Sequence, residues 1–198
     1  MRSGCSKICV PQLFVCAMSA LLAGCVPWQF SGYRPNGSGA LESGYCVAGI
    51  RDRMRFNALR GVDILVYAAK DNQNQTILLE VSLVVPDGVT ARFLSSDLVL
   101  RSPEWPQSRA LSIYRITGGM ARVHEPSAVL PGSANASTGT FTLWFMRGEV
   151  GTLWQTGLPL VRSFTVSLPP MTIDGRQFDL EEVAFRSYRE WGMFTCAQ

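Results

Sequence analysis

The feature that most constrains the fold is a two-residue alternation of apolar and other side chains. It is clearest at 76–85, where every second residue from Leu79 to Val85 is apolar. A period of two places alternate side chains on opposite faces of a β-strand, so that one face can be buried. The pattern returns at 141–145 and 164–168. These segments predict strands that each present an apolar face to a core.

Further short runs of apolar and β-branched residues indicate more strands, at 45–50, 63–69, 89–93, 97–101, 110–116 and 182–188. Turn-forming sequences separate them, and Asp174-Gly175 is a good hairpin candidate. The only helical expectation is a turn or two at 52–59. Many short strands at this spacing predict an all-β domain, an antiparallel β-sandwich or barrel. We favour an immunoglobulin-like sandwich, as a layout only, because the Cys…Trp…Cys spacing of antibody domains is absent.

The first 24 residues have a different character from the rest of the chain. They contain Arg2 and Lys7 and no acidic residue, and an apolar run extends from Leu13 to Leu22. A basic start, a short apolar run and small residues before a break point are typical of a cleaved secretory signal. The run is shorter than the about 20 residues that a membrane-spanning helix needs.

The end of this segment, Leu22-Ala23-Gly24-Cys25, resembles the lipobox of bacterial lipoproteins. The resemblance implies that residues 1–24 are a signal peptide, cut before Cys25, and that the Cys25 thiol carries a diacylglycerol that anchors the protein to a membrane. Val26, not Asp, follows, which in Gram-negative lipoproteins implies the periplasmic face of the outer membrane. The alternatives are an ordinary secretory signal or a buried apolar helix. The resemblance covers only residues 1–25.

The composition changes after Cys25. Residues 26–44 are rich in Gly, Ser and Pro and lack periodicity, so we expect 25–44 to form a lipidated, flexible tether with an end-to-end distance of about 24 Å. Its aromatic residues Trp28, Phe30 and Tyr33 either rest at the lipid interface or pack back on the domain. Residues 45–198 then form one β-sandwich domain.

The charge balance argues against nucleic-acid binding. Removal of the signal peptide leaves 16 basic and 15 acidic residues, and no basic cluster remains that has the footprint of a nucleic-acid site. The nearest approach is Arg51, Arg53 and Arg55, with Asp52 among them. A solvated face of a turn or strand explains this cluster better than a phosphate or lipid-headgroup site.

Two cysteines, Cys46 and Cys196, remain in the predicted domain. An even pair in an oxidising compartment predicts a disulfide, and two buried free thiols are the alternative. A zinc site is excluded because two cysteines and the single, distant His124 cannot supply enough ligands. No metal and no cofactor is predicted.

A repeated tripeptide is the strongest local feature of the domain. Thr142-Leu143-Trp144 recurs as Thr152-Leu153-Trp154, so a hairpin between them would pair the two tryptophans. Such a pair serves sheet stability more often than ligand binding. Yet Trp144 and Met146 lie opposite the apolar face of their strand, so Trp144, Met146 and Trp154 are also a candidate binding patch.

The sequence predicts no catalytic residue. His124 is the only base for a Ser-His-Asp or Cys-His system, and no Gly-x-Ser-x-Gly motif occurs. A pair of carboxylates could serve a glycosidase, but Glu181 and Glu182 are adjacent, so on a strand they point to opposite faces and do not converge on a substrate.

The aromatic run at 188–194 is interpreted as a closing strand that anchors the core, and alternatively as an edge that binds a partner strand.

These observations favour a non-catalytic lipoprotein of the outer membrane that binds an envelope protein partner or has a structural role. The membrane is reached through the lipid on Cys25, and no nucleic acid is bound. A small envelope hydrolase and a carrier of a lipid or other hydrophobic ligand are the alternatives.

Overall fold

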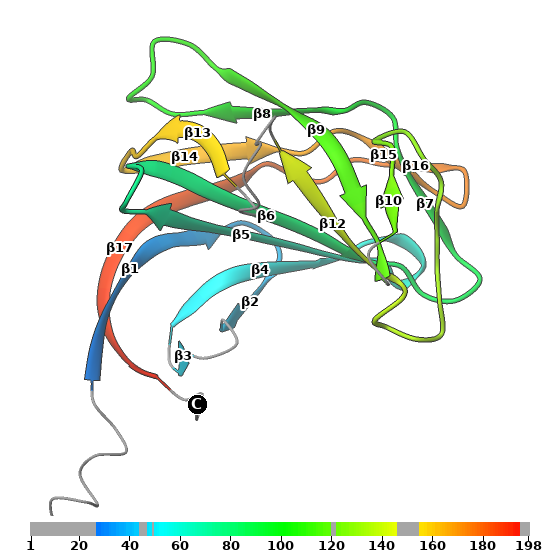
Figure 1. The fold of residues 1–198 in the computed structure, drawn as a ribbon, viewed down its shortest axis with the longest axis horizontal. Helices are drawn as coiled ribbons and strands as arrows, with labels where there is room; N and C mark the ends of the chain where they lie inside the picture. The colour runs from blue at the N-terminus through cyan, green and yellow to red at the C-terminus, as the bar shows by residue number, and fades with distance from the viewer. Residues whose placement is uncertain (1–26, 44–46, 49, 120–121, 146–154, 195–198) are drawn as a thin grey trace, which may run out of the picture.

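The computed structural model describes residues 27–43, 47–48, 50–119, 122–145 and 155–194 (Figure 1). These residues form antiparallel β-strands, and no α-helix occurs among them. The prediction of an all-β antiparallel domain is therefore confirmed. The immunoglobulin-like sandwich is not confirmed, because most strands follow one another within one curled sheet.

The larger sheet contains ten strands in a continuous order and three short strands that pair beside them. The continuous order is β1 (Pro27–Asn36), β17 (Val183–Phe194), β14 (Ser163–Ser167), β8 (Asp97–Arg101), β9 (Arg109–Thr117), β12 (Thr140–Phe145), β6 (Thr76–Val84), β5 (Asp63–Asp71), β4 (Arg51–Asn57) and β2 (Ala40–Ser43). The additional strands are β10 (Val123–His124) on β9, β13 (Gln155–Pro159) on β6 and β3 (Val47–Ala48) on β17.

A smaller sheet has the order β11 (Leu130–Pro131), β7 (Thr90–Phe93), β15 (Met171–Ile173) and β16 (Arg176–Phe178). Asp174 and Gly175 connect β15 to β16 with φ angles of 47° and 75°. Positive φ at both central residues suits a tight hairpin, so the turn predicted at this dipeptide is confirmed. A three-residue 3-10 turn, η1 (Leu59–Gly61), connects β4 to β5.

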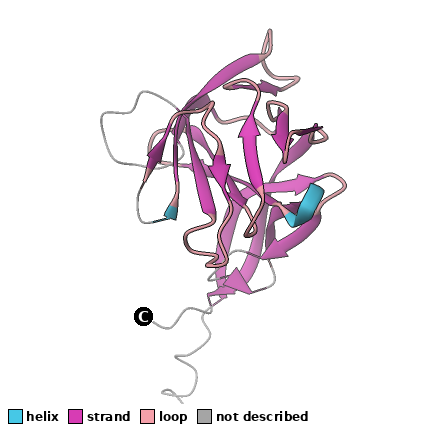
Figure 2. Ribbon diagram, turned by 90° about the vertical axis from the view of Figure 1, so that its right-hand side faces the viewer, coloured by secondary structure: helices cyan, strands magenta, loops and turns pink. Residues whose placement is uncertain are grey.

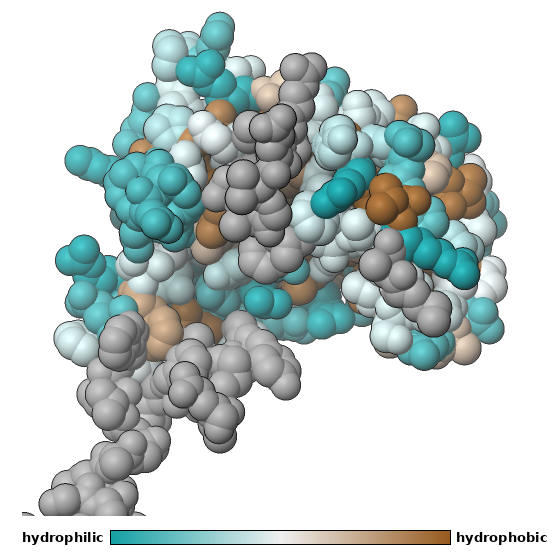
Figure 3. Space-filling model, viewed as in Figure 1, coloured by the Kyte–Doolittle hydropathy of each residue, from teal (hydrophilic) through white to brown (hydrophobic). Residues whose placement is uncertain are grey.

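The larger sheet curls into a near-barrel (Figures 1 and 2). Its two ends approach each other, because β1 contacts β4 and β5 without pairing with them. The alternation predicted for 76–85 is present in β6, where Leu79, Val81 and Leu83 are fully buried. Side chains from the whole circumference fill one core. On the face in Figure 3, apolar side chains appear in small patches among hydrophilic ones.

The segment 52–59, expected to form a helical turn, is mostly strand β4. Its buried positions, Asp52, Met54 and Phe56, recur every second residue. The intervening arginines face away from the core, and this two-residue period is that of a strand.

The predicted tether 25–44 is wrong over 27–43, which forms β1 and β2. β1 pairs with β17 over ten residue pairs, from Pro27 opposite Met193 to Asn36 opposite Ala184. The Gly, Ser and Pro content suggested a coil, but β1 is an edge strand in the sheet order, where proline is tolerated. Gly32 has a packing role, because a Cβ there would come within 3.1 Å of the Tyr188 ring.

Tyr33 is the residue through which β1 enters the core. Its side chain is fully buried, and its ring packs edge-on against Phe164 at 4.9 Å. Its hydroxyl donates to the carbonyl of Val161 at 2.9 Å and accepts from the Val161 amide at 3.2 Å. Burial raises the pKa of this hydroxyl. Of the three aromatics in the supposed tether, Tyr33 therefore packs on the domain, while the side chain of Trp28 lies outside the described part.

Tyr33→Phe should lower the free energy of unfolding by about 1–3 kcal/mol, because both backbone groups of Val161 lose a buried partner. Urea unfolding followed by fluorescence measures the change. Tyr114→Phe is the control, since that tyrosine is exposed and its change should stay within about 0.5 kcal/mol. Equal effects of the two substitutions would contradict this role of Tyr33.

Candidate functional site

A groove of about 620 Å³ lies on the outside of β1, β17, β14 and β8. Three arginines line it, Arg34, Arg101 and Arg186, and no Asp or Glu does. We call it the arginine groove. Leu41 of β2 and Tyr188 of β17 add apolar surface to its lining. The groove therefore combines positive charge with an apolar lining.

Strand register explains why the surface is hollow here. One row across the sheet is Arg34, Arg186 and Ser163, and the next is Asn36, Ala184, Thr165 and Arg101. Residues directly opposite each other on antiparallel strands share a face. Ala184 and Thr165, in the middle of the second row, and Ser163, at the end of the first, have small side chains, and the long arginines stand beside them.

Arg34 is held by an acidic residue of the neighbouring strand. Its guanidinium donates to both carboxylate oxygens of Glu190, at 2.9 and 2.6 Å, and lies 5.2 Å from the centre of the Tyr188 ring. These hydrogen bonds lower the pKa of Glu190. Burial, together with the charge of Asp52, raises the pKa of Tyr188. Arg34 is thereby fixed in orientation at the groove.

Arg101 is fixed by a second acidic residue. Glu182 Oε1 accepts from Arg101 at 2.8 Å, from the Thr165 hydroxyl at 2.8 Å and from the Ser167 hydroxyl at 3.0 Å. The hydrogen bond from Thr165 is the main cause that lowers the pKa of Glu182, and Ser167 and Arg101 add to it. Three donors from two strands converge on a single oxygen.

Arg186 differs from the other two arginines. It is exposed, and no carboxylate pairs with it within the described ranges. It lies directly opposite Arg34, and like charges in that position destabilise a sheet. The guanidinium of Arg186 is therefore available to an anionic group that enters the groove.

Three sites expected from the sequence concern cysteines, and all lie outside the described residues: the lipidated Cys25 and the disulfide partners Cys46 and Cys196. The nearest described residues are informative for the pair. Val47 of β3 pairs with Phe194 of β17, next to Cys46 and two residues before Cys196. The chain segments that lead to the two cysteines thus lie side by side, and the disulfide stays a prediction.

Of the predicted aromatic patch, only Trp144 is described; Met146 and Trp154 lie outside the described residues. Trp144 lies on the face of β12 opposite the buried Leu143 and Phe145, as predicted. Its indole donates to the Thr117 hydroxyl at 2.7 Å, and Arg115 lies 4.2 Å above its ring. These contacts give Trp144 a structural role on the outer face of the sheet.

The other polar candidates lie apart from the arginine groove. His124 packs edge-on against Phe141, with 5.6 Å between ring centres, in a separate hollow of about 280 Å³. Glu181 lines a groove with Arg55 and Asp63, whereas Glu182 contacts Thr165, so the two adjacent glutamates diverge as expected. Within the described ranges, no three His, Cys, Asp or Glu side chains gather as metal ligands would.

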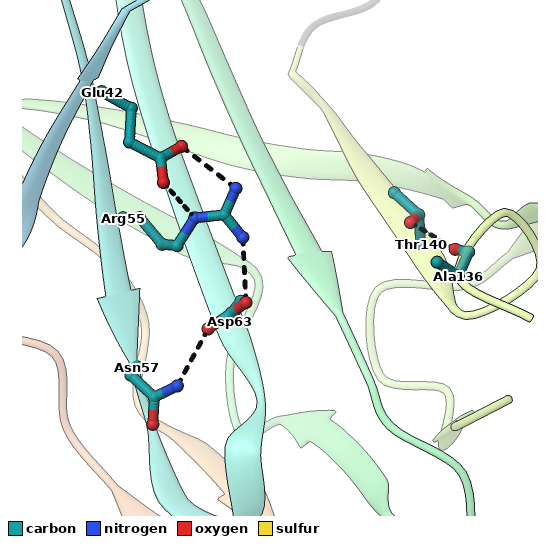
Figure 4. Close-up of polar contacts among 6 residues, drawn as sticks. All are labelled: Glu42, Arg55, Asn57, Asp63, Ala136 and Thr140. Atoms are coloured by element: carbon teal, nitrogen blue, oxygen red, sulfur yellow. Dashed lines mark hydrogen bonds and ion pairs between the residues drawn. The ribbon is translucent and has the colours of Figure 1, made fainter. Parts of the chain in front are cut away.

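The arginine cluster of β4 is a strand face, as the sequence indicates. Arg55 donates to Glu42 and to Asp63, and Asp63 also accepts from Asn57 (Figure 4). Arg53 lies 4.9 Å from the centre of the Tyr67 ring. These contacts occupy both side chains in cross-strand interactions.

Comparison with protein-family models, with curated proteins and with solved structures finds no match for this chain. Among the described residues, no helix has the length and apolar character needed to span a membrane.

Glu182→Gln should lower the free energy of unfolding at pH 7 by up to about 1 kcal/mol, the range for exposed ion pairs. Because folding lowers this pKa below its ordinary 4.5, the stabilisation is complete above pH 4.5 and is lost as the pH falls further. Urea unfolding at pH 7 and pH 3 should therefore show a larger difference from the native protein at pH 7.

Glu181→Gln is the control for this experiment, since Glu181 is an exposed neighbour that lines a different groove. A Glu182→Gln effect that is as large at pH 3 as at pH 7 would contradict the assignment of the stabilisation to the Glu182 carboxylate.

Proposed function

We propose that the chain is the precursor of a lipoprotein, anchored through Cys25 to the periplasmic face of the outer membrane, with a non-catalytic binding role. The observation that carries this proposal is the lipobox-like tetrapeptide Leu22-Ala23-Gly24-Cys25, one residue before the first described strand. A cut before Cys25 would remove the N-terminal segment and leave β1 whole.

The arginine groove supplies the binding role. Arg186 lies directly opposite Arg34 on the neighbouring strand, where the two positive charges repel each other. It lacks an acidic partner in the described part of the chain. Guanidinium groups bind carboxylates in a planar, bidentate way. We infer that the groove receives an acidic segment of an envelope protein partner, whose apolar side chains contact Leu41 and Tyr188.

A protein partner fits the groove better than the two alternative functions do. The groove lies on the outside of the sheet, whereas the interior is filled by core side chains, so a hydrophobic ligand would not be enclosed as a carrier requires. A hydrolase with a histidine base would have to use His124, whose ring packs on Phe141 away from this groove. A hydrolase with two carboxylates is also disfavoured, because Glu182 and Glu190 each bind an arginine.

Cys25→Ala should abolish lipidation and move the protein from the membrane fraction to the soluble fraction of the envelope, because the acyl chains supply the membrane affinity. Fractionation followed by immunodetection measures the distribution. Cys16→Ala, a cysteine inside the apolar run, is the matched control and should leave the protein membrane-bound. Unchanged membrane association of Cys25→Ala, together with normal removal of residues 1–24, would refute the anchor.

A photo-cross-linking amino acid in place of Leu41 should capture a discrete protein in cells, because Leu41 lines the groove and is 39% exposed. When Arg186→Glu is combined with the cross-linker at Leu41, the product should disappear, since the substitution reverses the charge offered to an acidic segment. Immunoblotting after irradiation detects the product, and mass spectrometry identifies the partner.

Two controls make this result specific. The same cross-linker at Tyr114, an exposed residue of β9, should not give the product, and Arg176→Glu, on an exposed arginine of β16, should not reduce it. A product that persists in Arg186→Glu, or that forms equally from Tyr114, would contradict binding through the arginine groove.

A further inference from the structure

The chain itself limits the distance between the proposed anchor at Cys25 and the sheet. Only Val26 separates Cys25 from Pro27, where β1 begins. Consecutive Cα atoms are about 3.8 Å apart, so Pro27 lies at most about 7–8 Å from Cys25. Two further residues at about 3.4 Å each place Gln29 within about 15 Å. A lipid on Cys25 would thus hold the end of the β1–β17 ribbon beside the lipid headgroups.

This end of the ribbon extends beyond the core. Tyr33 and the opposite Ser187 are the last pair on the inward face that contacts the core, since Tyr33 is fully buried and Ser187 accepts from Lys70 at 2.6 Å. Toward Pro27, Ser31, Gln29, Arg189 and Trp191 on the same face are exposed. Figures 1 and 2 show this part of β1 and β17 at the lower end of the molecule.

Trp191 is the prominent side chain on that exposed face. It pairs with Gln29 and is 69% exposed, the largest exposure among the large hydrophobic residues described. The opposite face of the ribbon is covered there, because a Cβ on Gly192 would come within 3.0 Å of Ile50 Cδ1. The exposure of Trp191 is thus a property of one face and does not reflect a ribbon that lacks packing.

Basic side chains accompany Trp191. Arg189, two residues away on the same face, is exposed, and its charge is one cause that lowers the pKa of Lys70, after burial. Neither cation has a carboxylate partner among the described residues. Tryptophan is enriched where headgroups meet the acyl chains, and arginine is attracted to anionic lipid phosphates.

We propose that the exposed face of the β1–β17 ribbon, with Trp191 and Arg189, rests on the bilayer surface and orients the whole domain. This inference depends on the proposed lipid anchor at Cys25. Trp191 lies at the acyl–headgroup boundary, and Arg189 contacts lipid phosphates. The domain therefore lies directly on the membrane and contacts it through β1 and β17.

Fluorine NMR of the lipidated, full mature protein labelled with 5-fluorotryptophan tests this contact. The chain has five tryptophans, and Trp191→Phe identifies the Trp191 resonance by its loss. In bicelles of phosphatidylcholine and phosphatidylglycerol that carry a nitroxide on the lipid headgroup, the Trp191 resonance should lose most of its intensity. Trp105 and Trp144, each assigned by its own Phe variant, are internal controls that should keep theirs.

Each outcome has a distinct meaning. A membrane-bound protein whose Trp191 resonance survives like those of Trp105 and Trp144 would overturn the inference and leave the anchor standing. A mature protein that carries no lipid and does not bind the bicelles would contradict both. Arg189→Glu should reduce the broadening of Trp191 without release of the protein, which separates the contact from the anchor.

Discussion

The pairing of β1 with β17 is the interaction on which the rest of this structure depends. It joins residues 27–36 to residues 184–193, near the two ends of the chain. Without it, the curled sheet would lose the strand that contacts β4 and β5, and Tyr33 would leave its place beside Phe164. Such long-range contacts form only after a large loss of chain entropy, so their side-chain packing has to compensate for it.

The same pairing creates the arginine groove and the end of the β1–β17 ribbon that we propose rests on the membrane. Arg34 and Arg186 come together only because their strands are in register, and the acidic partner of Arg34 is Glu190, also on β17. Farther along the ribbon, the register places Gln29 beside Trp191. Core closure, the proposed binding surface and the proposed membrane-facing end thus follow from one set of backbone hydrogen bonds.

Local patterns predicted the parts of the fold that have local causes. The period of two identified the strands around Leu79, Leu143 and Val166, whose inward faces are buried, and Asp174-Gly175 identified a hairpin by its backbone preference. The prediction of a tether was wrong at 27–43, because a high content of glycine and proline is typical of a coil, and their place in an edge strand becomes evident only when the partner strand is known. The arginine groove could not be predicted from the sequence, because Arg34 and Arg186 are far apart in sequence, share no motif and come together only through the pairing of β1 with β17.

The central claim is that the mature chain begins at a lipidated Cys25, so that its first strand starts at the membrane. Mass spectrometry of the N-terminal peptide, from protein purified from the envelope of the producing cell, tests this claim most directly. The account predicts a mature chain whose first residue is Cys25, with a diacylglycerol on its thiol. A chain that still contains residues before Cys25, or that begins at an unmodified Cys25, would contradict it.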